Sequence, residues 1–402
     1  MRSGFKKWRL VGMVFIALAL NTCSRFMPYL LPLEDLPEPP GPHAVGTGSL
    51  VWTDSSRNLI MKEDTTAREL LVQVWYPAQA DENGEILGYI DHGISRLRAI
   101  GRLMHVPPIF YRHFLNVKTN AYQDAPILEC AERRHVILFS HGLGGMRFQN
   151  SILMETLASH GFICLAIEHP GDANLSVTSS GISTRYEDEL PREPVSDAFL
   201  DRRRQDLENR VADMAFILNA LEQQHSTPSI PGLRQQMDLG HIGVMGHSLG
   251  AASVLELART DPRVQAVLSL DGWFLPFKEQ APPLHCSKPL LHLGQDHWRD
   301  PRLDKMTTLL FSRGTGPRYR VVLYGTRHTD FTDMPHFTPL TRFLGYTGQI
   351  QPELLGAFLN DVSVAFFRQY LAVDPAVSLT ATLDTFVDFS ISYMVWPARL
   401  SP

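Results

Sequence analysis

Short apolar runs alternate with longer amphipathic stretches along most of the chain. Runs typical of buried strands lie at 70–76, 135–140, 162–168, 242–245, 264–270, 289–293 and 319–323, and another strand begins near 49–52. Helices are expected over 148–160, 201–222 and 354–371, and in the second of these apolar residues recur every three or four positions. This order of elements predicts the α/β class, with a mostly parallel central sheet and helices on both faces.

Four segments depart from this regular order. Residues 32–42 are rich in proline and suggest an extended linker, whereas 82–124 suggest an irregular, partly helical insertion. Residues 169–198 carry few apolar side chains and suggest a loop or lid. In the tail, apolar residues alternate with mostly polar ones over 387–395, as in an edge strand. Packing on the core, covering a partner and touching a membrane all stay open as roles for this tail.

The amino terminus has the pattern of an export signal. Four of the first nine residues are basic, and they precede an apolar run over 10–20 that is short for a transmembrane helix. We therefore expect an exported protein, periplasmic or secreted. A retained anchor at the membrane and lipid attachment at Cys23 are the alternatives.

Composition narrows the classes of function. The 402 residues are 44% hydrophobic and 20% charged, ordinary values for a globular chain with a large core. A net charge of -5 argues against a protein that binds nucleic acid through an electropositive surface. The four cysteines lack metal-ligand spacing, so no metal or cofactor is predicted. Cys164 is expected to be buried, and pairing of Cys130 with Cys286 stays open.

Residues 246–250 have the sequence GHSLG, a G-x-S-x-G pattern between an apolar strand and the small residues of 251–255. Strand, sharp turn and helix in this order are the context of a nucleophile elbow, which holds the serine in strained backbone geometry. Glycines two residues before and after the serine avoid a collision of side chains. We therefore predict that Ser248 is a catalytic nucleophile.

A serine nucleophile needs a base, and the base needs an acid that orients it. In the chain order typical of such folds, the histidine follows the last core strand. His328 follows the strand expected at 319–323, with His336 as its rival. Asp271 follows the strand after the elbow, and Asp296 follows the next strand. The residues alone leave the choice between these two acids open.

The oxyanion formed in acyl transfer needs two hydrogen-bond donors. One expected donor is the backbone N–H of Leu249, directly after the serine. The other should come from a loop after an earlier strand, and the glycine-rich sequence at 139–145 fits that position. We predict that Leu143 supplies the second donor and that Gly144 lies against the substrate.

Several collinear segments resemble the platelet-activating-factor acetylhydrolase family of plasma and bacterial type, also called group VII phospholipase A2. These segments are GPHAVGT (41–47), VWYP (74–77), FSHGLG (139–144), LASHGF (157–162), EH (168–169), GHSLG (246–250), LDGWF (270–274) and RHTDFTD (327–333). The resemblance implies an α/β-hydrolase fold. It also implies calcium-independent hydrolysis of short or oxidised sn-2 acyl esters of phospholipids, a substrate that is met at a membrane surface.

The resemblance carries the family's triad onto Ser248, Asp271 and His328, and thereby favours Asp271 over Asp296. It places the oxyanion donors on the same two leucine amides. The elbow departs from the mammalian pattern at Leu249 and Ala251, where the mammalian enzymes have Phe and Gly.

The aromatic residues Trp273 and Phe274 either line an acyl pocket or pack in the core. A general carboxylesterase or polyester hydrolase with the same triad is the alternative function, and an inactive hydrolase fold that binds lipid is a further one. The expected organisation is an export signal or anchor (1–22), a proline-rich linker (23–48), an α/β-hydrolase catalytic domain (49–371) and an extension of unknown role (372–402).

Overall fold

The structure is a computed structural model of the chain. The structure describes residues 27–29, 31–59, 65–79, 83–187, 195–223, 230–278, 286–296, 298, 300–371, 374, 376–386, 390–396 and 398. The export signal expected over 1–22 and the alternative lipid attachment at Cys23 lie outside these residues. Among the described residues, no helix is both long and apolar enough to cross a bilayer.

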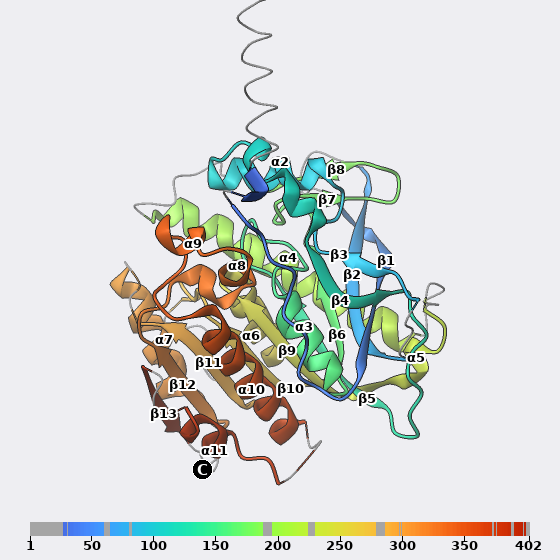
Figure 1. The fold of residues 1–402 in the computed structure, drawn as a ribbon. Helices are drawn as coiled ribbons and strands as arrows, with labels where there is room; N and C mark the ends of the chain where they lie inside the picture. The colour runs from blue at the N-terminus through green and yellow to red at the C-terminus, as the bar shows by residue number, and fades with distance from the viewer. Residues whose placement is uncertain are drawn as a thin grey trace, which may run out of the picture.

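A single twisted sheet forms the centre of the molecule (Figure 1). Within the described ranges it has eleven strands, in the order β13-β12-β11-β10-β9-β5-β6-β2-β1-β4-β3. The bounds are β1 (Ala44–Asn58), β2 (Ala67–Ala78), β3 (Ile86–Gly88), β4 (Lys118–Gln123), β5 (Arg134–Ser140), β6 (Ile163–Ile167), β9 (Met237–His247), β10 (Val264–Leu270), β11 (Leu290–Gln295), β12 (Arg318–Leu323) and β13 (Ile391–Trp396). The six neighbouring strands β6, β5, β9, β10, β11 and β12 are parallel to one another, so their carboxyl ends meet at one edge.

Helices cover both faces of this sheet, as the sequence predicted. In Figure 1, α3 (Ser151–Ser159) and α10 (Pro352–Tyr370) lie in front, and α4 (Asp197–Glu222), α6 (Leu249–Thr260) and α7 (Pro301–Arg313) lie behind. Successive residues of a strand point to opposite faces. In β5, Val136 and Leu138 therefore join the core with α4 and α6, while Ile137 and Phe139 join the core with α3 and α10.

The strands and helices expected from the apolar pattern are all present. Helix α4 begins earlier than expected, at Asp197, because the Ser196 hydroxyl accepts a hydrogen bond from the Phe199 amide and caps the helix. Helix α7 was not predicted, although its buried residues Leu303, Met306 and Leu310 follow a helical spacing.

Parts of the two irregular segments, the helical part of the insertion and the hairpin of the expected lid, lie at the same end of the molecule (Figure 1). The insertion contains β3, α2 (Ile94–Met104), η1 (Pro108–Phe110), η2 (Arg112–Asn116) and β4. The expected lid contains a small hairpin of β7 (Ser176–Val177) and β8 (Ser183–Thr184), followed by the start of α4.

The sheet extends at both ends beyond the range 49–371 that we expected for the main domain. Strand β1 begins at Ala44, inside the expected linker. In the tail, β13 pairs antiparallel with β12 and forms the sheet edge, which confirms the predicted edge strand. Its Trp396 ring lies 5.1 Å from Phe311 of α7, so the tail packs on the core.

Candidate active site

Ser248 lies at the sharp turn between β9 and α6. Its φ of 58° and ψ of -121° are strained for a residue with a side chain. Neighbouring backbone holds this geometry, because the Ser248 amide donates to the Leu270 carbonyl at 3.1 Å and the Ser248 carbonyl accepts from the Trp273 amide at 3.0 Å. A Cβ at Gly246 or Gly250 would overlap neighbouring backbone, so both positions require glycine.

His328 and Asp271 meet at the same edge of the sheet, after β12 and β10. The distance from His328 Nδ1 to Asp271 Oδ2 is 2.6 Å. Asp271 is fully buried and accepts three further hydrogen bonds. They come from the Gln295 amide (3.0 Å), Gln295 Nε2 (2.8 Å) and Trp298 Nε1 (3.2 Å). The carboxylate is therefore fixed on the ring nitrogen that faces it.

Burial by itself would raise the pKa of Asp271. The hydrogen bond and charge of His328 and the hydrogen bond of the Gln295 amide act in the opposite direction and hold the pKa below its ordinary value. Asp271 is thus an ionised carboxylate in a dry site, where its charge acts strongly on His328.

The rival residues lie elsewhere. Asp296 is partly exposed at the end of β11, next to Gln295, whose amide and side chain both donate to Asp271. His336 packs against Gly356 of α10, and burial lowers its pKa. The geometry thus favours Asp271 and His328 as the pair beside Ser248.

The loop after β5 lies directly against the serine. A Cβ at Gly142 would be 3.3 Å from Ser248 Cβ. The Gly142 carbonyl accepts a hydrogen bond from His141 Nδ1 at 2.7 Å. Because a trans peptide directs its C=O and N–H in opposite directions, this bond turns the Leu143 amide the other way. Within the described residues, neither the Leu143 nor the Leu249 amide has a backbone acceptor, which leaves both N–H groups available to an oxyanion.

A buried arginine fixes this loop from below. Arg210 of α4 is fully buried and donates to the His141 and Gly142 carbonyls and, at 2.6 Å, to Asp172. The His141 ring accepts from the His169 amide at Nε2, consistent with a proton on Nδ1. Burial, followed by the charge of Arg210, lowers the pKa of His141 well below its ordinary value and keeps it neutral.

A second buried chain supports the end of β5. Ser140 Oγ lies 3.0 Å from His169 Nε2, and His169 Nδ1 lies 2.9 Å from Asp213, which pairs with Arg68 at 2.7 Å. We did not predict Arg210 or Asp213 from the sequence. The signal was a row of charged residues spaced by three and four within the buried face of α4, at 203, 206, 210 and 213.

His247 holds the loop of His328 in place. Its Nε2 donates to the His328 carbonyl at 3.1 Å, and its Nδ1 accepts from Gln149 Nε2 at 3.0 Å. The two imidazole rings stack at 4.4 Å. Burial, with the charge of His328, lowers the pKa of His247 to about 3, so it is neutral beside the candidate base.

The expected substrate contacts fare differently. Gly144 has a φ of 69°, and a Cβ there would be 3.2 Å from Tyr186 and 3.4 Å from Leu103. Trp273 is partly exposed and lies 6.0 Å from Phe199 of α4. Phe274, by contrast, is fully buried and packs on Phe277. Phe274 is therefore a core residue, because substrate cannot reach a side chain without exposed surface.

The structure also shows the state of the cysteines and one group of residues that could hold a metal ion. Cys130 is exposed and Cys286 is buried, and both are free thiols; Cys164 is buried as expected. Among the described residues, His135, Asp238 and His241 have potential metal-ligand atoms within 4.8 Å of one another. They lie at the amino-terminal parts of β5 and β9, at the opposite edge of the sheet from Ser248, so they take no part in its chemistry.

Comparisons with known proteins bear on the family of the chain. A family model described as platelet-activating factor acetylhydrolase, isoform II, matches residues 32–377. The platelet-activating factor acetylhydrolase of the dog, Canis lupus familiaris, is 26% identical over 363 residues, which cover 84% of this chain and 78% of that protein. A probable 1-alkyl-2-acetylglycerophosphocholine esterase of Arthroderma benhamiae is 26% identical over 283 residues, which cover 65% of this chain and 64% of that protein.

The structure of a ferulic acid esterase from Streptomyces cinnamoneus superposes with a TM-score of 0.69 at 25% identity. The match covers 90% of this chain and 99% of that one. The sheet order, the elbow and this neighbour together identify an α/β-hydrolase fold. With the family model matched over most of its length, the chain belongs to the platelet-activating factor acetylhydrolase family, isoform II, and is a carboxylic ester hydrolase.

Proposed function

We propose that the chain is a calcium-independent serine esterase that hydrolyses short or oxidised sn-2 acyl esters of phospholipids through an acyl-enzyme. The observation that carries this proposal is the 2.6 Å hydrogen bond between His328 and the buried Asp271, at the edge where Ser248 is held in its strained turn. Membership of the family supports the substrate class.

In the first half-reaction, His328 takes the proton of Ser248 as Oγ bonds to the acyl carbon. The carbonyl oxygen becomes an oxyanion, which accepts hydrogen bonds from the Leu143 and Leu249 amides. The C–O bond to the glycerol oxygen then breaks, and His328 gives its proton to that oxygen. Asp271 fixes the ring tautomer and stabilises the charge on His328 throughout.

In the second half-reaction, His328 removes a proton from water, and the hydroxyl attacks the acyl carbon. The bond to Ser248 Oγ breaks, and His328 returns the proton to the serine. The products are a lysophospholipid from the first half and a short carboxylic acid from the second.

An apolar cavity near the candidate active site supports a lipid substrate. It has a volume of about 350 Å³ and borders Gln149, which contacts His247, and Thr332 in the loop of His328. Its wall includes Ile100, Met104 and Phe110 of the insertion. An alkyl chain placed there would gain about 0.8 kcal/mol for each buried CH₂ group.

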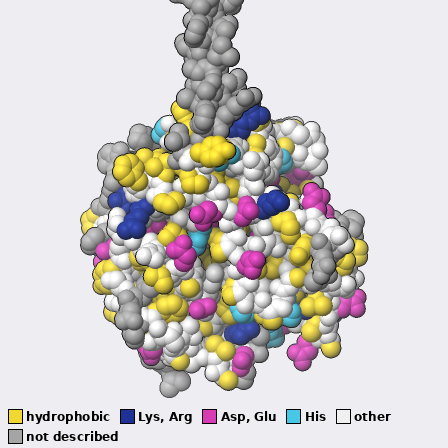
Figure 2. Space-filling view, viewed as in Figure 1, with side chains coloured by type: hydrophobic (Ala, Val, Ile, Leu, Met, Phe, Trp, Pro, Cys, Tyr) yellow, Lys and Arg dark blue, Asp and Glu magenta, His cyan; other side chains and the backbone are white. Residues whose placement is uncertain are grey.

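An exposed apolar surface supports a role at a membrane surface. Figure 2 shows hydrophobic side chains gathered at the end of the molecule that carries α2 and α9 (Leu340–Phe343). Exposed residues of this region are Leu103, Phe110, Phe343 and Leu344, and Phe343 is 85% exposed. We also propose that the chain is exported, on the basis of the basic and apolar residues at its amino terminus.

A substrate panel tests the proposal. It compares 2-acetyl phospholipid, long-chain phospholipid, p-nitrophenyl esters and polyester, each with and without a calcium chelator. We expect the highest kcat/KM on the 2-acetyl phospholipid, unchanged by chelation. A phospholipid rate at background would contradict the proposal.

The second candidate is a general carboxylesterase or polyester hydrolase with the same triad. The structural likeness to a ferulic acid esterase favours this alternative, because that neighbour is named for an aromatic ester. Labelling with a fluorophosphonate, mapped to Ser248, separates both candidates from an inactive fold.

A further inference from the structure

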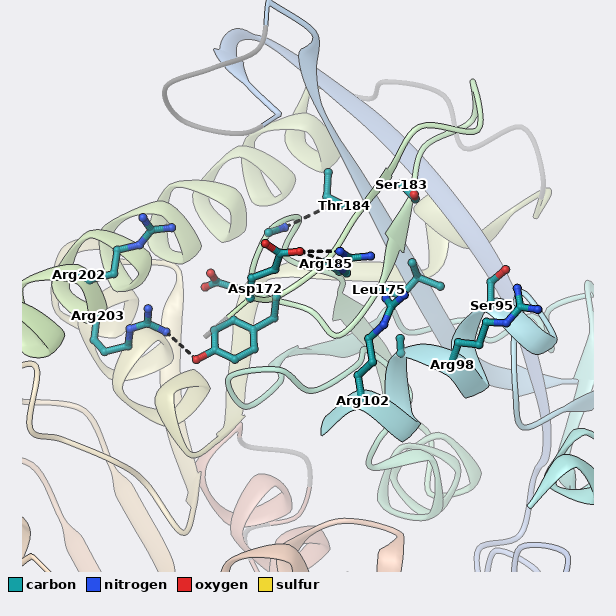
Figure 3. A pocket seen from close by; sticks show the side chains of 14 residues that line it. Ser95, Arg98, Arg102, Asp172, Leu175, Ser183, Thr184, Arg185, Arg202 and Arg203 are labelled. Atoms are coloured by element: carbon teal, nitrogen blue, oxygen red, sulfur yellow. Dashed lines mark hydrogen bonds and ion pairs between the residues drawn. The ribbon is translucent and has the colours of Figure 1, made fainter. Parts of the chain in front are cut away.

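A cavity rich in arginine lies between α2, the β7–β8 hairpin and α4 (Figure 3). Its volume is about 600 Å³. Among the described residues, its wall includes five arginines and only two acids: Arg98, Arg102, Arg185, Arg202 and Arg203, with Asp172 and Glu187. Figure 3 shows Arg98 and Arg102 reaching from α2, Arg202 and Arg203 on α4, and Arg185 between the two helices.

Part of this positive charge is already compensated. Arg202 and Arg203 pair with Asp206, at 3.1 and 3.0 Å. Arg185 pairs with Glu187 at 2.8 Å, but both side chains are about half exposed, so the pair is weak. The acid Asp172 is engaged by the buried Arg210.

Arg98 and Arg102 carry the uncompensated charge. They are one turn apart on the same face of α2, both are exposed, and within the described ranges neither has an ion-pair partner. Like charges at this spacing repel each other, so the pair is unfavourable unless an anion lies between them. An exposed position alone does not explain why both point into one cavity.

The helix that carries them is firmly anchored. Arg96, on the opposite face of α2, is fully buried and donates to Asp91 at 2.6 Å, to Glu168 at 2.8 Å and to the Leu175 carbonyl at 2.7 Å. These bonds tie α2 to the end of β6 and to the segment before β7. Arg98 and Arg102 therefore project from a rigid element, as a binding site requires.

The arginine cavity adjoins a second cavity that reaches the candidate active site at Leu143. This second cavity, of about 540 Å³, shares Arg102, Arg185 and Tyr186 with the arginine cavity and is also lined by Leu143. Gly144 packs against Tyr186, where a Cβ would be 3.2 Å from the ring. A substrate whose carbonyl lies at the Leu143 amide can thus extend along this groove to the arginines.

We propose that Arg98, Arg102 and Arg185 form a subsite for an anionic group of the ester substrate. Guanidinium groups bind phosphate and carboxylate through paired, charge-assisted hydrogen bonds. The anion is either the phosphate of the headgroup or a carboxylate at the far end of an oxidised acyl chain. This inference rests on the proposed function, since it assigns part of the substrate of the same site.

The test measures charge selectivity in two matched pairs of substrates. The first pair is 1-alkyl-2-acetylglycerophosphocholine and 1-alkyl-2-acetylglycerol, which differ in the phosphocholine group and hence in the phosphate that it carries. The second pair is the p-nitrophenyl monoester of glutaric acid and its neutral methyl ester, which differ in the carboxylate. The variant is Arg98→Gln/Arg102→Gln, and Arg133→Gln, an exposed arginine before β5, is the matched control.

We expect the ratio of kcat/KM for the member with the phosphate or carboxylate over the member without it to fall about tenfold or more in the double variant. A fall in the first pair assigns the subsite to the headgroup, and a fall in the second assigns it to the acyl end. Arg133→Gln should leave both ratios unchanged. Unchanged ratios in the double variant, or an equal fall in the control, would overturn the inference.

The two proposals fail separately. If the unmodified enzyme cleaves the p-nitrophenyl pair but not the acetyl phospholipid, the proposed function is wrong. The second pair then still decides whether the arginines bind an anionic group. Thermal melting of each variant verifies that the fold is retained.

Discussion

At the scale of single residues, the acid is the assignment with the sharpest consequence. Asp271 and Asp296 both follow strands of the sheet, and the apolar pattern places them equally well. The structure separates them by hydrogen bonding, because His328 Nδ1 bonds to Asp271, which also accepts from Gln295 and Trp298. Such contacts between residues far apart in the chain leave no trace in local sequence.

We predict that Asp271→Asn lowers kcat by about 10³ to 10⁴, because an amide can neither fix the reactive tautomer nor stabilise the imidazolium. Asp296→Asn should change kcat only a few-fold. Single-turnover acylation by p-nitrophenyl acetate measures both variants. Loss of acylation in Asp296→Asn alone would show that the acid was assigned wrongly.

At the scale of elements, α4 links the fold to the chemistry. Its buried face carries Arg210 and Asp213, and Arg210 donates to the His141 carbonyl and to the Gly142 carbonyl, whose peptide orients the Leu143 amide. The periodicity predicted the helix but not this role, because buried charges on an apolar face could equally have been a structural ion pair. The partners of Arg210, His141 and Asp172, come from loops whose path cannot be derived from periodicity.

We predict that Arg210→Met lowers kcat by about 10- to 100-fold with a smaller change in KM, because the Leu143 amide, the proposed oxyanion donor, loses its fixed direction. The matched control is Arg318→Met. Arg318 is also fully buried and donates to backbone carbonyls, those of Phe311 and Gly316, but at the start of β12.

Both arginine variants should lose stability. The loss should be about 3 kcal/mol for Arg210→Met, which leaves the carboxylate of Asp172 without its arginine partner. Only Arg210→Met should lose kcat at a temperature where both are folded. Equal kcat values in the two variants would reduce Arg210 to a purely structural residue.

The same scale explains which parts of the fold were predictable. Parallel strands buried on both faces give continuous apolar runs, so β5, β9, β10 and β12 could be placed from sequence. The proximity of α2 to the β7–β8 hairpin could not, because neither segment has a regular pattern and their contact depends on the buried Arg96. For that reason, the groove and the arginine cavity could not be predicted from the sequence.

At the scale of the whole molecule, a buried carboxyl links stability to pH. Glu155 of α3 is fully buried, and its nearest polar partner is Asn120 at 3.2 Å. Burial raises the pKa of Glu155 from 4.5 to about 8, against the weaker opposing effect of those hydrogen bonds. Below pH 4.5 such a carboxyl is protonated in both the folded and the unfolded state, so its raised pKa does not change the free energy of unfolding. It destabilises the fold progressively as pH rises towards 8.

We therefore predict that Glu155→Gln gains stability relative to the unmodified protein by about 2–4 kcal/mol between pH 5 and pH 8. Urea unfolding at the two pH values measures this difference. The exposed Glu129→Gln should show no such trend. A constant difference across the range would mean that Glu155 is ionised in the folded protein at pH 5.

The conformation of Ser248 has a consequence for the heat stability of the molecule. In ordinary positions, alanine makes a protein more stable than glycine, because an unfolded chain with alanine has less conformational entropy to lose on folding. At a φ of 58° and ψ of -121° the order should invert, since any Cβ is disfavoured there. Neither Ser248→Gly nor Ser248→Ala can form an acyl-enzyme, yet the glycine variant should melt about one to three degrees higher than the alanine variant. Calorimetry of the two variants would thus measure how much stability the fold gives up to hold the proposed nucleophile in this turn.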